Sequence, residues 1–215
     1  MAKKTPGTEK SVTVKRSSKE SEVSVKADLS KSRGDLKKGI KTPLQFFNHM
    51  LETIAWRSCI NIGVSLKLSD YRLTHVICED TGIVLGEALR ELLGKEMKKG
   101  VNGSGCAYAC IDEALARCAV SFEDRAQIHV SENLTSGPEL VEDMQAADLV
   151  GFLEGVSQGS RATLHVDLVR GVNPHHVWES VFRAFGEALR EAFAPCPFRK
   201  GTTPGVKGVV RMEKE

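Results

Sequence analysis

Apolar side chains recur every three or four positions in four parts of the chain, which is the spacing of amphipathic helices. The sequence predicts a long helix that ends at Gly94 and a second that starts at Pro174, with Asn173 as its cap. Two shorter helices are predicted over residues 43–54 and 149–156, one ahead of each long helix.

Strand-like runs of apolar and β-branched residues lie between these helices. They cover residues 11–15, 22–28, 60–68, 118–122, 127–130 and 162–168. We expect residues 109–117 to form a turn that runs into a strand, and residues 133–138 to form a polar, exposed loop. The predicted fold class is therefore α/β: a two-layer α/β sandwich, duplicated as two pseudo-symmetric halves.

The duplication is visible as a repeat in the sequence. His75 and Glu79 are followed by Gly-Glu-Ala-Leu-Arg-Glu at 86–91, and His175 and Glu179 by the same six residues at 186–191, so matched positions differ by 100. A turn-rich segment near residue 100 marks the boundary. We expect a flexible tail over 1–10, halves over 11–100 and 101–198, and a C-terminal tail over 199–215 that contributes to the site.

Composition places the chain among ordinary globular proteins. The 215 residues are 41% hydrophobic and 27% charged, and the net charge of +2 argues against a general nucleic-acid binder. Residues 1–41 hold twelve Lys or Arg against five Asp or Glu, which indicates either a solvated arm or a basic rim that attracts an anionic substrate.

No apolar run predicts a membrane span or a secretory signal. Six cysteines without a CxxC pair are typical of buried, reduced thiols in a cytoplasmic protein.

The spacing of histidine and glutamate points to a metal site. Residues four apart share a helix face, so His75 with Glu79, and His175 with Glu179, can each aim at one point. A single such pair is usually a surface ion pair or a cap, but two pairs in repeat register favour metal binding. Imidazole and carboxylate together suit manganese, iron or zinc. Each helix supplies only two ligands, so both halves are expected to donate to a shared centre.

Other histidines carry different expectations. His176 lies about one hundred degrees around its helix from His175, so it cannot easily serve the same ion, but it can serve a second one. His49, in a largely apolar helix, is a candidate ligand. His129 and His165 are in strand-like stretches and are expected to be structural, and Asp112-Glu113 is interpreted as capping or solvation.

Taken in order, these motifs resemble the imidazoleglycerol-phosphate dehydratase family from about residue 12 to 210. The HxxxE pairs resemble the two HHxxE motifs of that family, and 46–51 resembles its FLDHML segment. Further similar segments are 16–21 (RxTxET), 112–117 (MDEALAR), 163–171 (TLHV…RG) and 204–208 (PSTKG).

The resemblance implies a ribosomal protein S5 domain 2-like sandwich made twice, and trimers that build a 24-subunit shell with active sites between subunits. It implies one or two Mn²⁺ ions held by imidazole and carboxylate groups: His49, His75, Glu79, His175, His176 and Glu179. A phosphorylated imidazole substrate would bind the metal through its ring and lose water from its side chain. Glu20, Glu79 and Glu179 are the catalytic candidates, and Glu20, Arg125 and Lys207 the substrate-binding ones.

The chain departs from the family pattern at positions that carry chemistry. Val76 replaces the second histidine of the first motif, and Gly151 stands where the family has another histidine. Gly103 aligns with a phosphate-binding arginine, and Gly205 with the serine of PSTKG. Valine and glycine cannot ligate, so the expected set falls to four His and two Glu: either one ion keeps a fuller set, or both are short by one.

Three functions therefore stay open from the sequence. The first is a working hydro-lyase of histidine biosynthesis, which the retained ligands and Glu20 support. The second is a catalytically impaired paralogue with a binding or structural role, which the joint loss of ligands and phosphate contacts supports. The third is a different metal-dependent enzyme on the same scaffold, because a fold does not fix a function.

Overall fold

The computed structural model describes residues 10–32 and 34–208. The tail expected over 1–10 lies outside the described residues except for Lys10, as does the end of the C-terminal tail from residue 209.

The first half of the chain forms a four-stranded sheet and two helices. The strands β1 (Ser11–Ser17), β2 (Ser21–Asp28), β4 (Asn61–Leu68) and β3 (Ile40–Lys41) lie in the order β1-β2-β4-β3. β1, β2 and β4 pair antiparallel, and the short β3 pairs parallel with β4. A single 3₁₀ turn, η1 (Lys37–Gly39), precedes β3, and the helices are α1 (Gln45–Ser58) and α2 (Thr74–Met97).

The second half repeats this topology. Its strands lie in the order β5-β6-β10-β7, with the same antiparallel and parallel pairings, and their bounds are Ser104–Ile111, Ala114–Ser121, Thr163–Arg170 and Gln127–Val130. The helices α4 (Ala146–Ser160) and α5 (Pro174–Ala192) correspond to α1 and α2. Additional short elements are α3 (Glu132–Thr135), the hairpin β8 (Leu140–Val141) with β9 (Met144–Gln145), and η2 (Pro197–Arg199).

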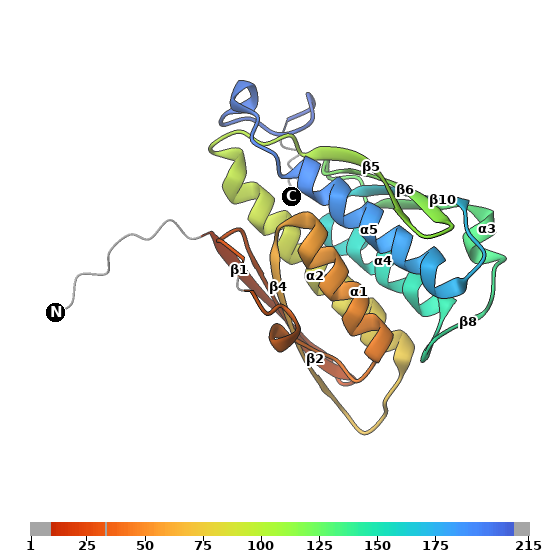
Figure 1. Cartoon of the computed structure of the whole chain (residues 1–215). Helices are drawn as coiled ribbons and strands as arrows, with labels where there is room; N and C mark the ends of the chain where they lie inside the picture. Colours follow the sequence, from red (N-terminus) through yellow and green to blue (C-terminus); the bar gives the residue numbers. More distant parts are fainter. Residues whose placement is uncertain (1–9, 33, 209–215) are drawn as a thin grey trace, which may run out of the picture.

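The helices of the two halves lie between the two sheets, so the layers run sheet, helices, helices, sheet (Figure 1). α2 packs on β1 and β2 from one side, and α5 packs on β5 and β6 from the other. Across the middle, α2 contacts α4, and α1 contacts α5. Phe47 of the first half and Phe152 of the second, both fully buried, meet with ring centroids 5.1 Å apart. One hydrophobic core therefore serves both halves.

Several local expectations are corrected. Gly94 does not end its helix, because α2 keeps helical geometry through it and runs to Met97. Residues 109–117 contain the end of one strand, a tight turn at Asp112-Glu113 with φ 44° at Asp112, and the start of the next strand. Residues 133–138 contain most of α3, whose Leu134 is buried.

The prediction of buried, reduced cysteines is correct for their free thiols but only partly correct for their burial. All six are free, but Cys59, Cys106 and Cys110 are exposed, while Cys78 and Cys118 are buried. Within the described part of the chain, no helix is long and apolar enough to cross a membrane.

Candidate metal centre

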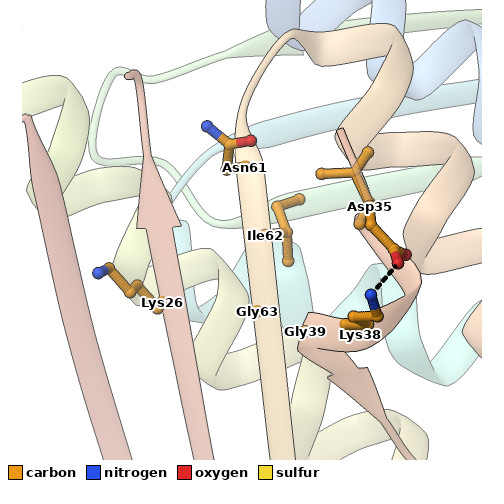
Figure 2. A pocket seen from close by; sticks show the side chains of 8 residues that line it. Lys26, Asp35, Lys38, Gly39, Asn61, Ile62 and Gly63 are labelled. Carbon is orange, nitrogen blue, oxygen red and sulfur yellow. Dashed lines mark ion pairs between the residues drawn. The ribbon is translucent and has the colours of Figure 1, made fainter. Parts of the chain in front are cut away.

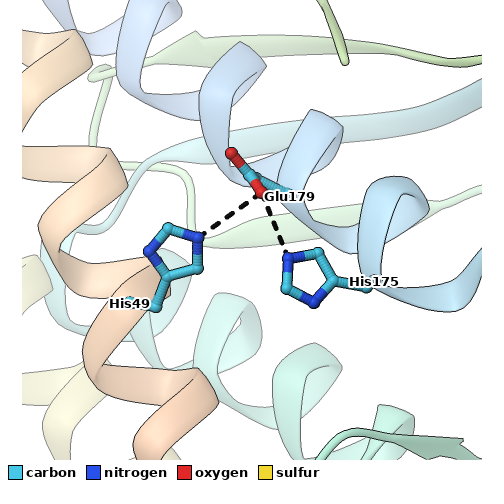
Figure 3. Close-up of side chains that lie close together, drawn as sticks. All are labelled: His49, His175 and Glu179. Carbon is cyan, nitrogen blue, oxygen red and sulfur yellow. Dashed lines mark hydrogen bonds and ion pairs between the residues drawn. The ribbon is translucent and has the colours of Figure 1, made fainter. Parts of the chain in front are cut away.

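Three potential metal ligands converge where α1 meets α5 (Figure 3). His49 comes from α1, and His175 and Glu179 lie one turn apart on α5. The Glu179 Oε2 atom lies 3.4 Å from Nε2 of His49 and 3.3 Å from Nε2 of His175. The atoms that these residues offer lie within 4.8 Å of one another, and no other group of three or more His, Cys, Asp or Glu does so among residues 10–32 and 34–208. We call His49, His175 and Glu179 the ligand triad.

The Glu179 carboxylate is held from its other side. Its side chain is only 8% exposed, and Oε1 accepts hydrogen bonds from Nε and Nη2 of Arg183 at 2.9 and 2.6 Å. Burial opposes ionisation, but the hydrogen bonds and charge of Arg183, together with His49, outweigh it and hold the pKa of Glu179 below its usual value. Glu179 therefore presents an ionised oxygen to both imidazoles.

A second carboxylate orients His175. Its Nδ1 lies 2.8 Å from Oε1 of Glu142, in the turn between β8 and β9. A hydrogen on Nδ1 leaves the lone pair on Nε2 facing the triad, which is how outer carboxylates position metal-binding histidines. The Asn173 side chain also accepts from the backbone N–H of His175, so the predicted cap fixes the start of α5.

The second half also anchors the helix that carries His49. Asp143 accepts hydrogen bonds from the backbone N–H groups of Gln45 and Phe46 at 2.7 and 3.0 Å, at the N-terminus of α1. A carboxylate at this end satisfies donors that the helix cannot pair internally. The Phe46 ring then lies 5.1 Å from the His175 ring, between centroids.

The first HxxxE pair stands elsewhere. His75 and Glu79 on α2 form an ion pair of 2.9 Å between Nε2 and Oε2, with side chains 65% and 42% exposed. In the described part of the chain, no third His, Cys, Asp or Glu joins this pair in a potential metal-binding group. The nearest atoms to a Cβ built on Gly151 belong to the His75 ring, at 3.7 Å, so the position of the missing histidine is adjacent to this pair.

His176 has separate partners, as its place around the helix predicts. Its Nδ1 lies 2.8 Å from Glu113 and its Nε2 3.4 Å from Asp112. The hydrogen bond to Glu113 raises the pKa of His176 above its usual value. The pKa of Glu113 falls to about 2, chiefly because the carboxylate accepts from the backbone N–H of Asn173 and then from His176. The Glu113 carboxylate therefore holds the backbone that leads into α5 and also orients an imidazole.

The remaining candidates lie in exposed loops and are not in the triad. Glu20 is in the turn between β1 and β2, Arg125 follows β6, and Lys207 lies in the C-terminal segment. Gly103 has φ 72°, and a Cβ there would lie 2.2 Å from the Pro204 side chain, so this backbone cannot carry an arginine without moving the C-terminal segment. A Cβ on Gly205 would lie 2.9 Å from the Glu123 carboxylate.

A cavity of about 420 Å³ opens beside the triad. His49 and Glu179 form part of its wall, and the cationic Lys37, Arg57 and Arg183 form another part. A different hollow, of about 280 Å³, lies along β4 at the edge of the first sheet and carries the ion pair of Asp35 and Lys38 (Figure 2). That second hollow contains none of the predicted ligands, whereas the cavity beside the triad is lined by two of them, and it is therefore the candidate site.

Sequence reasoning found the triad residues but missed their supports. Glu142 and Asp143 lie in a polar stretch with no repeat or periodicity, so their roles follow only from the tertiary structure. Arg183 was detectable, because it follows Glu179 by four positions on a predicted helix.

Comparisons with known proteins agree with this geometry. The family model for imidazoleglycerol-phosphate dehydratase matches residues 42–189, which include the triad. The enzyme of that name from Thioalkalivibrio sulfidiphilus is 37% identical over 196 residues, covering 91% of this chain and 95% of that protein. The Neisseria meningitidis relative is 35% identical over 201 residues, which are 94% of this chain but only 64% of that longer protein.

A solved structure has the same fold. The imidazoleglycerol-phosphate dehydratase from Pyrococcus furiosus, in complex with (S)-C348, aligns with a TM-score of 0.75 at 29% sequence identity, over 92% of this chain and 100% of that one. The sequence motifs, the doubled sandwich and the ligand triad now stand together with these matches. The chain belongs to the imidazoleglycerol-phosphate dehydratase family.

Proposed function

We propose that this protein is a hydro-lyase of histidine biosynthesis that eliminates water from imidazoleglycerol phosphate to give imidazole acetol phosphate. The observation that carries the proposal is the convergence of His49, His175 and Glu179 within 4.8 Å in a chain of this family. Family membership supplies the substrate and the reaction, and the triad supplies the means to hold the metal.

The residues present fit a divalent transition metal, and we propose Mn²⁺. Two imidazole nitrogens and one carboxylate oxygen are a donor set that such ions accept. Glu142 contacts Nδ1 of His175, and Arg183 donates to Oε1 of Glu179. The Nε2 atom of His175 and the Oε2 atom of Glu179 therefore stay available to a metal ion. When bound, the ion would act as a Lewis acid that stabilises negative charge developing on the substrate ring. His75, Glu79 and His176 are proposed as ligands of a second, weaker site rather than of the ion held by the triad.

The chain's own charged groups suit a phosphorylated substrate. Lys37, Arg57 and Arg183 line the cavity beside the triad against the two carboxylates of Glu52 and Glu179, so three positive charges face two negative ones. Arg125 and Lys207 are proposed as additional phosphate contacts, and Glu20 as the carboxylate that moves a proton on the side chain. These three lie in exposed loops outside the triad, which supports sites completed between subunits of a trimer-based 24-mer.

The organisation of the chain follows the same proposal. We place the first half at residues 11–100 and the second at 101–198, and we assign the segment from residue 199 to the substrate site. A cytoplasmic location fits an enzyme of amino-acid biosynthesis.

Two observations support a catalytically impaired paralogue as the alternative. The pair His75–Glu79 faces Gly151 rather than a third ligand, and the Glu123 carboxylate stands beside Gly205 where a phosphate contact is expected. Loss of one charged contact to a substrate costs roughly 1.5–3 kcal/mol.

The deciding experiment is turnover of imidazoleglycerol phosphate by the purified, manganese-loaded chain, followed as formation of imidazole acetol phosphate. We expect product from the native chain and none above background from His49→Ala. The solvent-facing Lys67→Ala variant, on the first sheet, is the control and should retain the native rate. Absence of product from a folded, metal-loaded native chain would contradict the proposal and leave the paralogue.

A further inference from the structure

The two halves of the protein can be superposed residue by residue at their first helices. Both α1 and α4 end in a left-handed residue, Cys59 at φ 59° and Arg161 at φ 53°, which stand 102 positions apart. The strands that follow, β4 and β10, each have eight residues and begin 102 positions apart. Each of the eight buried residues of α1 has a buried counterpart 102 positions later in α4.

This correspondence pairs His49 with Gly151. After β4 and β10 the connecting loops differ by two residues, so the second helices correspond with a shift of 100, and His75 and Glu79 pair with His175 and Glu179. The ligand triad on α1 and α5 therefore has a counterpart on α4 and α2. This counterpart consists of Gly151, His75 and Glu79. This set has the helix positions of the triad but lacks one of its three donors.

Helix packing does not require a glycine at position 151. On the same face of α4, a Cβ on Gly155 would lie 2.5 Å from the Glu79 carbonyl oxygen, and a Cβ on Gly159 would lie 2.0 Å from that of Ile83. At Gly151 the nearest atoms, in the His75 ring, are 3.7 Å away, which is ordinary van der Waals contact. The backbone at position 151 therefore accepts a Cβ without a clash, and that Cβ would lie beside the His75 imidazole.

The ligand triad and the incomplete set also differ in how far their side chains are exposed to solvent. In the triad the Glu179 side chain is 8% exposed and its oxygens are directed by Arg183 and the histidines. In the incomplete set the Glu79 side chain is 42% exposed and that of His75 is 65% exposed. A hydrated, two-donor pair binds a cation more weakly than a partly buried, three-donor group whose ligands are already oriented.

We propose that the two halves of this chain hold metal unequally: His49, His175 and Glu179 retain one tightly bound ion per chain, and Gly151 leaves His75 and Glu79 one ligand short of a second. This inference rests on the proposed function for the identity of the ion, and it assigns the missing third donor beside His75 and Glu79 to position 151. It also selects between the two arrangements that the sequence left open, in favour of one fuller set.

The test counts manganese in the full-length protein, independently of turnover. Metal-free protein is incubated with MnCl₂, desalted and analysed by elemental analysis, with the free ion followed by electron paramagnetic resonance. We expect one ion per native chain, none in His49→Ala, and still one in His75→Ala. Gly151→His should bind a second ion at least about tenfold more tightly than the native chain does, whereas Gly151→Ala should stay at one.

Two ions of equal affinity in the native chain, or none, would overturn the proposal. So would loss of the ion in His75→Ala, or a folded Gly151→His protein that still retains one ion. If Gly151→His fails to fold, the contrast between His49→Ala and His75→Ala decides by itself. An inactive native chain with one ion per chain would contradict the proposed reaction while upholding unequal metal binding, so the two failures are distinguishable.

Discussion

The two carboxylate oxygens of Glu179 have different interaction partners. Oε1 is engaged by the Arg183 guanidinium, and Oε2 faces His49 and His175. A carboxylate divided in this way keeps its charge although it is buried, and it offers one oxygen in a fixed direction. The two ring nitrogens of His175 also differ in their partners: Nδ1 contacts Glu142, and Nε2 faces Glu179.

Removing Glu142 tests whether this orientation matters for binding. In Glu142→Ala the His175 ring loses the partner that fixes its tautomer, so we expect manganese affinity to fall about 10- to 100-fold. Isothermal titration calorimetry on metal-free protein measures it. The exposed Glu139→Ala, in the same segment, is the matched control and should bind like the native chain. Equal affinities for the two variants would remove Glu142 from the site.

The Glu113–His176 pair predicts a pH dependence of stability in the metal-free protein. The pKa of Glu113 is lowered from 4.5 to about 2, so its contribution is present above pH 4.5 and lost as the pH falls toward 2. The pKa of His176 is raised from 6.5, so its contribution is present below pH 6.5 and lost as the pH rises through the raised value. Together they stabilise most between these two limits.

We therefore expect Glu113→Gln to lower the free energy of unfolding most near about pH 5.5, and less near about pH 3 or 9. Part of the effect should persist at high pH, because the charged carboxylate accepts from the backbone N–H groups of Val172 and Asn173 more strongly than a neutral amide oxygen does. Urea denaturation across the pH range measures the difference. A difference independent of pH would show that the ion pair does not contribute.

At the scale of elements, the backbones of α2 and α4 approach each other closely. A Cβ on Gly82 would lie 2.2 Å from the Phe152 carbonyl oxygen, and one on Gly86 would lie 2.4 Å from that of Val156. Glycines 155 and 159 meet α2 in the same way from the other side. The two backbones therefore touch directly, and this contact fixes the separation of the two halves.

Alanine at Gly86 should force α2 and α4 apart, because backbone atoms cannot move aside as a flexible side chain can. We expect a loss of about 1–3 kcal/mol in the free energy of unfolding, measured by urea denaturation. Gly94, in the same helix, has no atom within 4 Å of its Cβ position and is the matched control. Gly94→Ala should gain roughly 0.5–1 kcal/mol from helix propensity. Destabilisation by both variants, in equal amount, would contradict the packing argument.

Prediction from sequence succeeded where periodicity was strong and failed where it was weak. The four long helices and most strands followed from apolar spacing and from the repeat. β5 was missed because its Gly, Cys and Ala residues give no alternation of polar and apolar side chains. The HxxxE pairs were found, but Glu142 and Asp143 were not, since these hairpin residues contact helices that are distant in sequence. Glu142 contacts His175 across 33 positions, and Asp143 contacts Phe46 across 97.

For the whole molecule, the buried helix layers make the two halves mutually dependent. Each half alone would expose the helix faces that now pack across the middle, including Phe47 against Phe152. The chain is therefore expected to unfold as one unit rather than half by half.

The two tryptophans provide a probe for each half. Trp56 belongs to α1 and is 67% exposed, and Trp178 belongs to α5 and is 2% exposed. In the single-tryptophan variants Trp178→Phe and Trp56→Phe, fluorescence follows one half at a time. We expect urea midpoints that coincide with each other and with circular dichroism, at a common protein concentration. If the fluorescence midpoint of a variant differs from the circular dichroism midpoint of that same variant, the two halves unfold independently.

The cap that Asp143 provides has a consequence for synthesis. The N-terminus of α1 is completed by a carboxylate that lies 97 positions after Phe46, so it does not yet exist when α1 leaves the ribosome. The helix that carries His49 must wait with unpaired backbone donors until the hairpin of the second half has emerged and docked. The arrangement of the metal ligands is thus one of the last features of the native state that a nascent chain can reach.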